Sequence, residues 1–70
     1  MKEKIIAHLD RKLELTDRVD TTQAKRTFFD QAFGALVFAM ECVDADLEAE
    51  LIDIWTNKYK PAFERKVYGV

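Results

Sequence analysis

The sequence predicts an all-α fold, a small antiparallel bundle of three helices built by a single domain over residues 1–70. Three observations lead to this prediction. Apolar side chains recur at helical spacing in three stretches, good capping residues precede the second and third stretches, and only one proline and two glycines interrupt the chain. With 70 residues, of which 49% are hydrophobic, the chain can build one core.

The first predicted helix covers residues 2–18. When each residue advances by about 100°, its apolar side chains fall within one arc and charged side chains lie to the side or opposite. The arc contains Ile5, Leu9, Leu13 and Thr16, with Ile6 beside it. This is the pattern of an amphipathic helix that packs on one face.

The second predicted helix covers residues 22–43, after a short turn in which Asp20, Thr21 and Thr22 offer oxygen atoms to cap it. Its apolar residues span well over half of the helix circumference. We therefore expect this helix to be central in the bundle, or to bury its excess face in a second subunit.

Two residues of the second helix fall outside its apolar arc. Phe38 projects into the remaining polar sector, and so does Gly34. Glycine costs roughly 1 kcal/mol against alanine inside a helix. Gly34 therefore either marks a close approach of another backbone or is a tolerated surface glycine, and the sequence leaves both readings open.

The third predicted helix covers residues 45–68 and is bent or broken at Pro61, because proline cannot donate the helical hydrogen bond and clashes with the preceding turn. The acids that alternate with apolar residues over 44–50 could suggest a strand, but acids suit a first helical turn, with Asp44 or Asp46 as the cap. Gly69 is placed to end the helix. Apolar residues at helical spacing are Leu47, Leu51, Ile54, Trp55, Tyr59, Ala62, Phe63 and Val67.

The charges are segregated along the chain. Residues 31–53 carry six acidic side chains and no basic ones, whereas residues 54–70 carry four basic side chains and one acidic one. The acidic start of the last helix could therefore face a basic patch on a neighbouring helix or on a partner, or it could be a solvated surface.

No residue type in the chain forms a convincing catalytic, cofactor or metal site. His8 lacks the Glu-x-x-His spacing of a carboxylate metal site, so we interpret it as a surface or boundary histidine. Cys42 stands near Glu41 and Asp44, which disfavour a thiolate, and we expect it in the core or an interface. No serine and no glycine-rich phosphate loop occur, so we expect no enzymatic activity.

The acidic segment that begins at Asp44 partly resembles a calcium-binding loop. Asp44, Asp46 and Glu48 have the spacing of the start of such a loop. However, Ala49 stands where the loop needs glycine, and Trp55 stands where it needs a bidentate glutamate. Helix capping explains the same acids without a metal.

The segment from Trp55 to Tyr68 interleaves basic side chains with aromatic ones. Such a composition can bind single-stranded nucleic acid by stacking and charge. At helical spacing, Trp55, Tyr59 and Phe63 instead form a stripe typical of a core, and a protein-binding face is a third reading. The net charge of −2 argues against nucleic acid.

The sequence therefore predicts a non-enzymatic helical protein-interaction module that forms a homodimer or docks on a larger protein. The alternative is a small regulator that contacts nucleic acid through the basic C-terminal segment. A single cysteine and the lack of a secretory signal or membrane span favour a cytoplasmic location. The candidate interface residues are Phe33, Val37, Phe38, Met40, Trp55, Tyr59 and Phe63.

Overall fold

Helix α1 (Lys2–Asp17) and helix α2 (Thr22–Glu41) are joined by a short turn. A computed structural model describes residues 1–69, and Val70, the last residue of the predicted domain, lies outside the described residues. The side-chain oxygen of Thr21 accepts a hydrogen bond from the Ala24 backbone N–H at 3.1 Å, which caps α2. The capping residue expected from the sequence is thus confirmed within the predicted turn.

Residues 45–68 form one continuous helical rod in three parts: α3 (Ala45–Ile54), a π-helical turn η1 (Trp55–Tyr59) and α4 (Lys60–Tyr68). Asp44 caps α3 by accepting a hydrogen bond from the Leu47 backbone N–H at 2.9 Å. Gly69 ends α4 with a left-handed backbone at φ 73°, a conformation that glycine adopts without strain.

The three predicted helices are confirmed, with small differences at their ends. The second helix ends at Glu41 and not at 43. The reason lies in Asp44, whose extended backbone (φ −75°, ψ 171°) lets its side chain cap α3. The preceding residues must leave the helix to reach that conformation.

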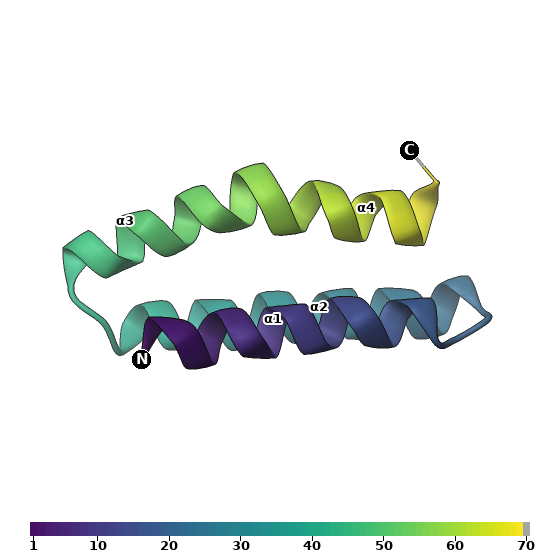
Figure 1. Ribbon diagram of the computed structural model, residues 1–70, viewed down its shortest axis with the longest axis horizontal. Helices are drawn as coiled ribbons and strands as arrows, with labels where there is room; N and C mark the ends of the chain where they lie inside the picture. The colour runs from purple at the N-terminus through teal and green to yellow at the C-terminus, as the bar shows by residue number, and fades with distance from the viewer. Residues whose placement is uncertain (70) are drawn as a thin grey trace.

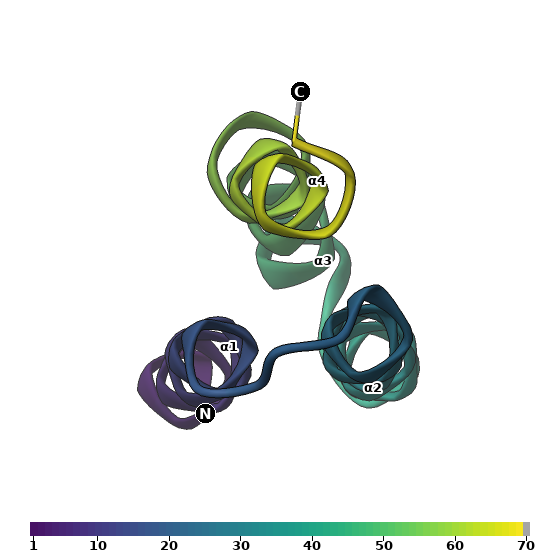
Figure 2. The same ribbon diagram turned by 90° about the vertical axis from the view of Figure 1, so that its right-hand side faces the viewer.

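Figure 1 shows α1 and α2 running in opposite directions, with the α3–α4 rod running parallel to α1. Viewed from the end, the three rods occupy the corners of a triangle (Figure 2). The expectation that the second helix is central is therefore wrong, because α2 has a neighbour on each of two sides and an open third side. None of the helices in residues 1–69 has the length and apolar character needed to cross a membrane.

The core lies on the axis of this triangle. Each rod contributes fully buried side chains, and half-buried aliphatic and aromatic residues surround them. The buried hydrophobic residues are Leu9 from α1, Ala32 and Leu36 from α2, and Leu51, Trp55, Tyr59, Phe63 and Val67 from the third rod.

The irregularity predicted at Pro61 takes the form of the π turn just before it. The Lys60 backbone N–H donates to the carbonyl oxygen of Trp55, five residues back, so the helix widens without breaking. Pro61 then falls in the first turn of α4, where its missing N–H and fixed φ are tolerated.

Three polar contacts join α1 to the parallel rod. Lys2 pairs with Glu50 and Asp17 with Lys66, while Tyr59 donates a hydrogen bond to Asp10 at 2.6 Å. The sequence separation is 48 in the first contact and 49 in the other two. The π turn lies between Glu50 and Lys66, and the one residue that it adds accounts for this change of register.

Candidate functional site

The structure divides the seven predicted interface residues into two groups. Those on the third rod are buried, and Met40 is half-buried against the core. The other three residues, all on α2, have large exposed fractions. The exposed fractions are Phe33 49%, Val37 36% and Phe38 69%, against Trp55 7%, Tyr59 0% and Phe63 0%.

The aromatic residues of the third rod pack inside the chain, as the core interpretation predicted. The ring centroids of Phe63 and Phe29 are 5.2 Å apart with an interplanar angle of 9°. Trp55 packs against Phe29 at 5.9 Å and against Phe33 at 5.5 Å. These are favourable aromatic distances, and the rings of Trp55, Tyr59 and Phe63 are not available for stacking with nucleic-acid bases.

Tyr59 has a polar group at the end of a fully buried ring. Its hydroxyl group donates a hydrogen bond to Asp10 of α1. Burial of the phenol, reinforced by the hydrogen bond to Asp10 and by its negative charge, raises the pKa of Tyr59 well above its ordinary value. This contact fixes α1 against the third rod and is structural.

Three of the exposed apolar residues lie where α2 and α3 are neighbours. Phe33 and Val37 are one helical turn apart on α2 and point to nearly the same side. Ile52 of α3 is 46% exposed and lies three residues before Trp55, about 60° around the helix. Ile52 lies about 200° around α3 from Glu50, which pairs with Lys2 of α1, and Trp55 packs on Phe29 and Phe33 of α2. Ile52 therefore lies on the side of α3 toward α2. We call Phe33, Val37 and Ile52 the apolar seam.

Ile52 is not among the interface residues predicted from the sequence. The sequence signal that could have found Ile52 is its position beside the apolar stripe formed by Leu51 and Trp55. Periodicity alone does not say which side faces α2, because that depends on how the rods pack.

A cavity of about 230 Å³ adjoins the apolar seam. Its walls are the aromatic rings of Phe29, Phe33 and Trp55, with the charged side chains of Asp30 and Lys60 also lining it. An apolar floor with a charged rim is suited to receive an aliphatic side chain from a partner.

Phe38 is exposed on a different side of α2. It lies five residues after Phe33, which is about 140° around the helix, and faces away from the core. The structure therefore does not bring Phe38 together with the apolar seam. A single exposed apolar residue of this kind is normal on a protein surface.

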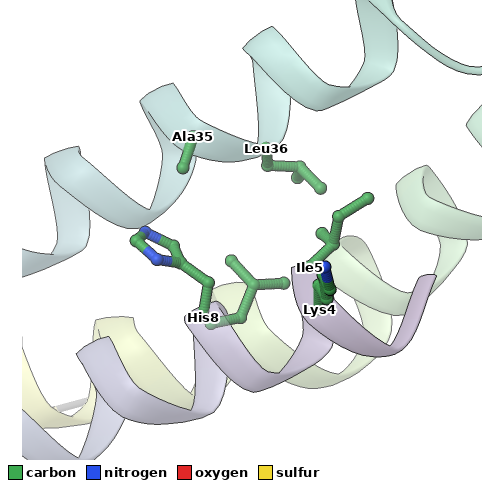
Figure 3. Close-up of a pocket in the computed structure, with 6 residues that line it drawn as sticks. Lys4, Ile5, His8, Ala35 and Leu36 are labelled. Atoms are coloured by element: carbon green, nitrogen blue, oxygen red, sulfur yellow. The ribbon is translucent and has the colours of Figure 1, made fainter. Parts of the chain in front are cut away.

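A second, smaller cavity of about 170 Å³ lies between α1 and α2. Figure 3 shows Lys4, Ile5 and His8 from α1 beside Ala35 and Leu36 from α2. His8 is exposed, as expected for a surface or boundary histidine. The lining is aliphatic except for the two basic residues at its edge.

Cys42 is exposed at the end of α2, so its expected place in the core is wrong, while a place in an interface stays a prediction. The cause is the early end of α2, which turns Cys42 out before Asp44 caps the next helix. The acids from Asp44 onward belong to the first turns of α3. Within residues 1–69, no group of three or more potential metal-binding side chains is present.

The segregated charges meet at two points within the chain. Lys2 at the start of α1 pairs with Glu50 of the acidic segment, and Lys66 of the basic segment pairs with Asp17. All four side chains are substantially exposed, so each pair contributes little to stability. Glu41 and Glu48, each four residues along its helix from a residue of the apolar seam, are also exposed.

Comparison of the chain with protein-family models, with curated proteins and with solved structures finds no match.

Proposed function

We propose that the chain is a non-enzymatic protein-interaction module that docks through the apolar seam. The observation that carries the proposal is the exposure of Phe33, Val37 and Ile52 at one junction of two helices, beside a cavity walled by aromatic rings. Grouped apolar side chains beside a pocket are typical of docking sites, whereas scattered ones are not.

Covering the apolar seam with a partner is energetically favourable. Removing apolar surface from water contributes roughly 25 cal/mol per Å², and a chain of this size buries a smaller fraction of its surface on folding than a larger domain does. Since Phe33 already packs against Trp55, it is held in place before a partner arrives, which reduces the ordering cost of binding. We place this role in the cytoplasm, where the single cysteine, Cys42, would stay reduced.

The experiment compares two substitutions on the same helix. Phe33→Lys places a charge in the apolar seam, while Phe38→Lys makes the same change at an exposed phenylalanine on another side of α2. Tagged wild-type and variant chains are expressed in the native host, cross-linked and purified with their bound proteins. We expect wild type and Phe38→Lys to retain the same protein contacts, second copies included, and Phe33→Lys to lose them.

Circular dichroism of each purified variant shows whether it still folds. Equal retention of every contact by the folded Phe33→Lys variant would refute docking through the apolar seam. Loss of the contacts in Phe38→Lys alone would place the docking surface on the other side of α2.

A further inference from the structure

The residues of α2 on the side of the apolar seam form a stripe with opposite charges at its two ends. Arg26, Phe33, Val37 and Glu41 fall within about 80° of one another around the helix. Arg26 and Glu41 are exposed, and no hydrogen bond or ion pair engages either side chain within residues 1–69. We call these four residues, with Gly34 beside them, the α2 stripe.

The α2 stripe is complementary to itself when turned end for end. The midpoint between Arg26 and Glu41 falls between Phe33 and Gly34, in the middle of the exposed apolar part. Two copies of α2 packed antiparallel about that midpoint place Arg26 of each copy level with Glu41 of the other. A parallel pairing would place arginine against arginine and glutamate against glutamate, which is unfavourable.

Gly34 has no steric role within the chain. A Cβ atom added there would meet nothing within 4 Å, and its backbone is helical, so glycine only weakens the helix relative to alanine. In the antiparallel pairing, Gly34 lies level with Phe33 of the other copy. A residue without a side chain then leaves room for the partner's phenylalanine ring, which explains why glycine occurs at this helical position.

The cavity beside the seam gains an occupant in the same arrangement. Asp30, which lines the cavity together with Phe33 and Lys60, lies level with Val37 of the other copy. Val37 is exposed and aliphatic, as the aromatic floor of the cavity requires. By symmetry the contact occurs twice, so each copy supplies one projecting valine and one receiving cavity.

From these observations we propose that the partner of the apolar seam is a second copy of this chain. The two α2 helices pack antiparallel about a two-fold axis that passes between Phe33 and Gly34. This inference rests on the proposed function, whose partner it names. Helix α2 has 20 residues and is therefore roughly 30 Å long, long enough to hold both ends of the stripe in contact.

The first test uses charge reversal and sedimentation velocity from micromolar to millimolar concentration. We expect the wild-type mass to rise from 8.2 kDa to twice that value. Arg26→Glu and Glu41→Arg each turn two attractive pairs into repulsive ones and raise the dimer Kd about tenfold. The double variant restores opposite charges and recovers the wild-type Kd. Lys4→Glu, an equal change of charge on an exposed residue of α1, leaves the Kd unchanged.

Three outcomes would overturn the proposal. The first is a mass of 8.2 kDa at every concentration. The second is a double variant whose dimer Kd is raised by the product of the two single-variant increases. The third is an unchanged Kd in both single variants, because a parallel pairing or a different face predicts no effect. If the chain stays monomeric while Phe33→Lys still loses a cross-linked host protein, the dimer alone fails and the apolar seam remains the docking site.

The second test replaces Gly34 by glutamine, a good helix former with a long side chain. We expect a higher midpoint of thermal unfolding at low micromolar concentration, where the chain is monomeric, together with at least a tenfold rise in the dimer Kd. Ala7→Gln, the same kind of enlargement at an exposed position of α1, should leave the Kd unchanged. A Gly34→Gln variant that dimerises as well as wild type would overturn the proposed axis.

Discussion

At the scale of single residues, the contact between Tyr59 and Asp10 shows how one polar group is accommodated in an apolar core. The ring is fully buried, and its hydroxyl group reaches the exposed carboxylate of Asp10 at 2.6 Å. The hydrogen bond satisfies the hydroxyl group, while the carboxylate keeps its access to water. The contact therefore avoids the large cost of a buried charge.

The raised pKa of Tyr59 leads to a prediction about alkaline pH. The folded chain keeps the phenol proton at pH values where the unfolded chain has lost it. The unfolded state then binds fewer protons, so the free energy of unfolding falls as the pH rises above about 10, by up to about 1.4 kcal/mol per pH unit from this group. Below that pH the phenol is protonated in both states and its titration has no effect.

The measurement is urea unfolding between about pH 9 and 11. We expect Tyr59→Phe to lose about 1 kcal/mol at neutral pH, from the missing hydrogen bond, and to decline less steeply than wild type at high pH. Tyr68→Phe serves as the control because Tyr68 is 51% exposed. Identical pH slopes for Tyr59→Phe and wild type would contradict the assignment.

At the scale of secondary-structure elements, the π turn follows from the spacing of the core residues on the third rod. Leu51, Trp55, Tyr59, Phe63 and Val67 are each four residues apart, and all are buried. In a regular α-helix each step of four residues overshoots one turn by about 40°, so the stripe would drift away from the core. The wider turn at Trp55–Tyr59 corrects this drift.

If the π turn corrects this drift, one residue can be removed from the turn without loss of the fold. Deleting the exposed Lys58 leaves spacings of four, three, four and four, which a regular α-helix places on one face. Pro61 would then lie inside a regular helix, at a cost of about 3 kcal/mol. We therefore expect the Lys58 deletion combined with Pro61→Ala to fold, and to be more stable than the deletion alone by about that amount.

The control for this experiment is deletion of Gly34 from α2. Gly34 is also an exposed helical residue, but α2 has no π turn that could lose a residue and become a regular α-helix. The two halves of its buried face would rotate by about 100° relative to each other. Thermal unfolding followed by circular dichroism should show a folded chain in the first case and an unfolded one in the second. Unfolding in both cases would contradict the proposed role of the π turn.

The sequence predicts the three helices well because their signals are local. Thr21 and Asp44 each accept a hydrogen bond from a backbone N–H group three residues later in the chain. The apolar faces follow from the periodicity of the sequence. The π turn was missed because it depends on the drift summed along the whole rod. The exposed place of Cys42 was missed because it depends on where α2 ends.

The division of the candidate interface also depends on information that is not local. Periodicity places Phe33, Trp55 and Tyr59 alike on apolar faces, but only the packing of three rods in a triangle decides which of these faces is covered. Two rods cover the aromatic face of the third one, whereas the side of α2 with Phe33 is at the edge of the contact. The sequence therefore overestimated how much of α2 is enclosed.

At the scale of the whole molecule, stability comes from a single core at the centre of the triangle. The ion pairs between the rods are exposed and contribute little. A core of this size, without disulfide or metal, typically supplies only about 3–5 kcal/mol. A single substitution that places a charge on the axis of the bundle is therefore enough to unfold the chain.

Leu36 and Phe33 offer a direct comparison, because they lie on the same helix three residues apart. The sequence alone predicts equal damage from aspartate at either position, as both belong to the apolar arc of α2. In the structure, Leu36 is 1% exposed and Phe33 is 49% exposed. The expected damage therefore differs, because Leu36 is a core residue and Phe33 is at the surface.

We expect Leu36→Asp to abolish the fold, since a charge without a partner in the core costs more than the total stability of the domain. Phe33→Asp should cost only roughly 1–2 kcal/mol, because its side chain can reach water and only half of the phenylalanine surface is lost from contact. Circular dichroism at low micromolar concentration measures the helical content and the unfolding midpoint of both variants. Complete loss of helicity in both would mean that α2 is enclosed on all sides, contrary to the triangular arrangement. A folded Leu36→Asp variant would mean that the core does not lie where the three rods meet.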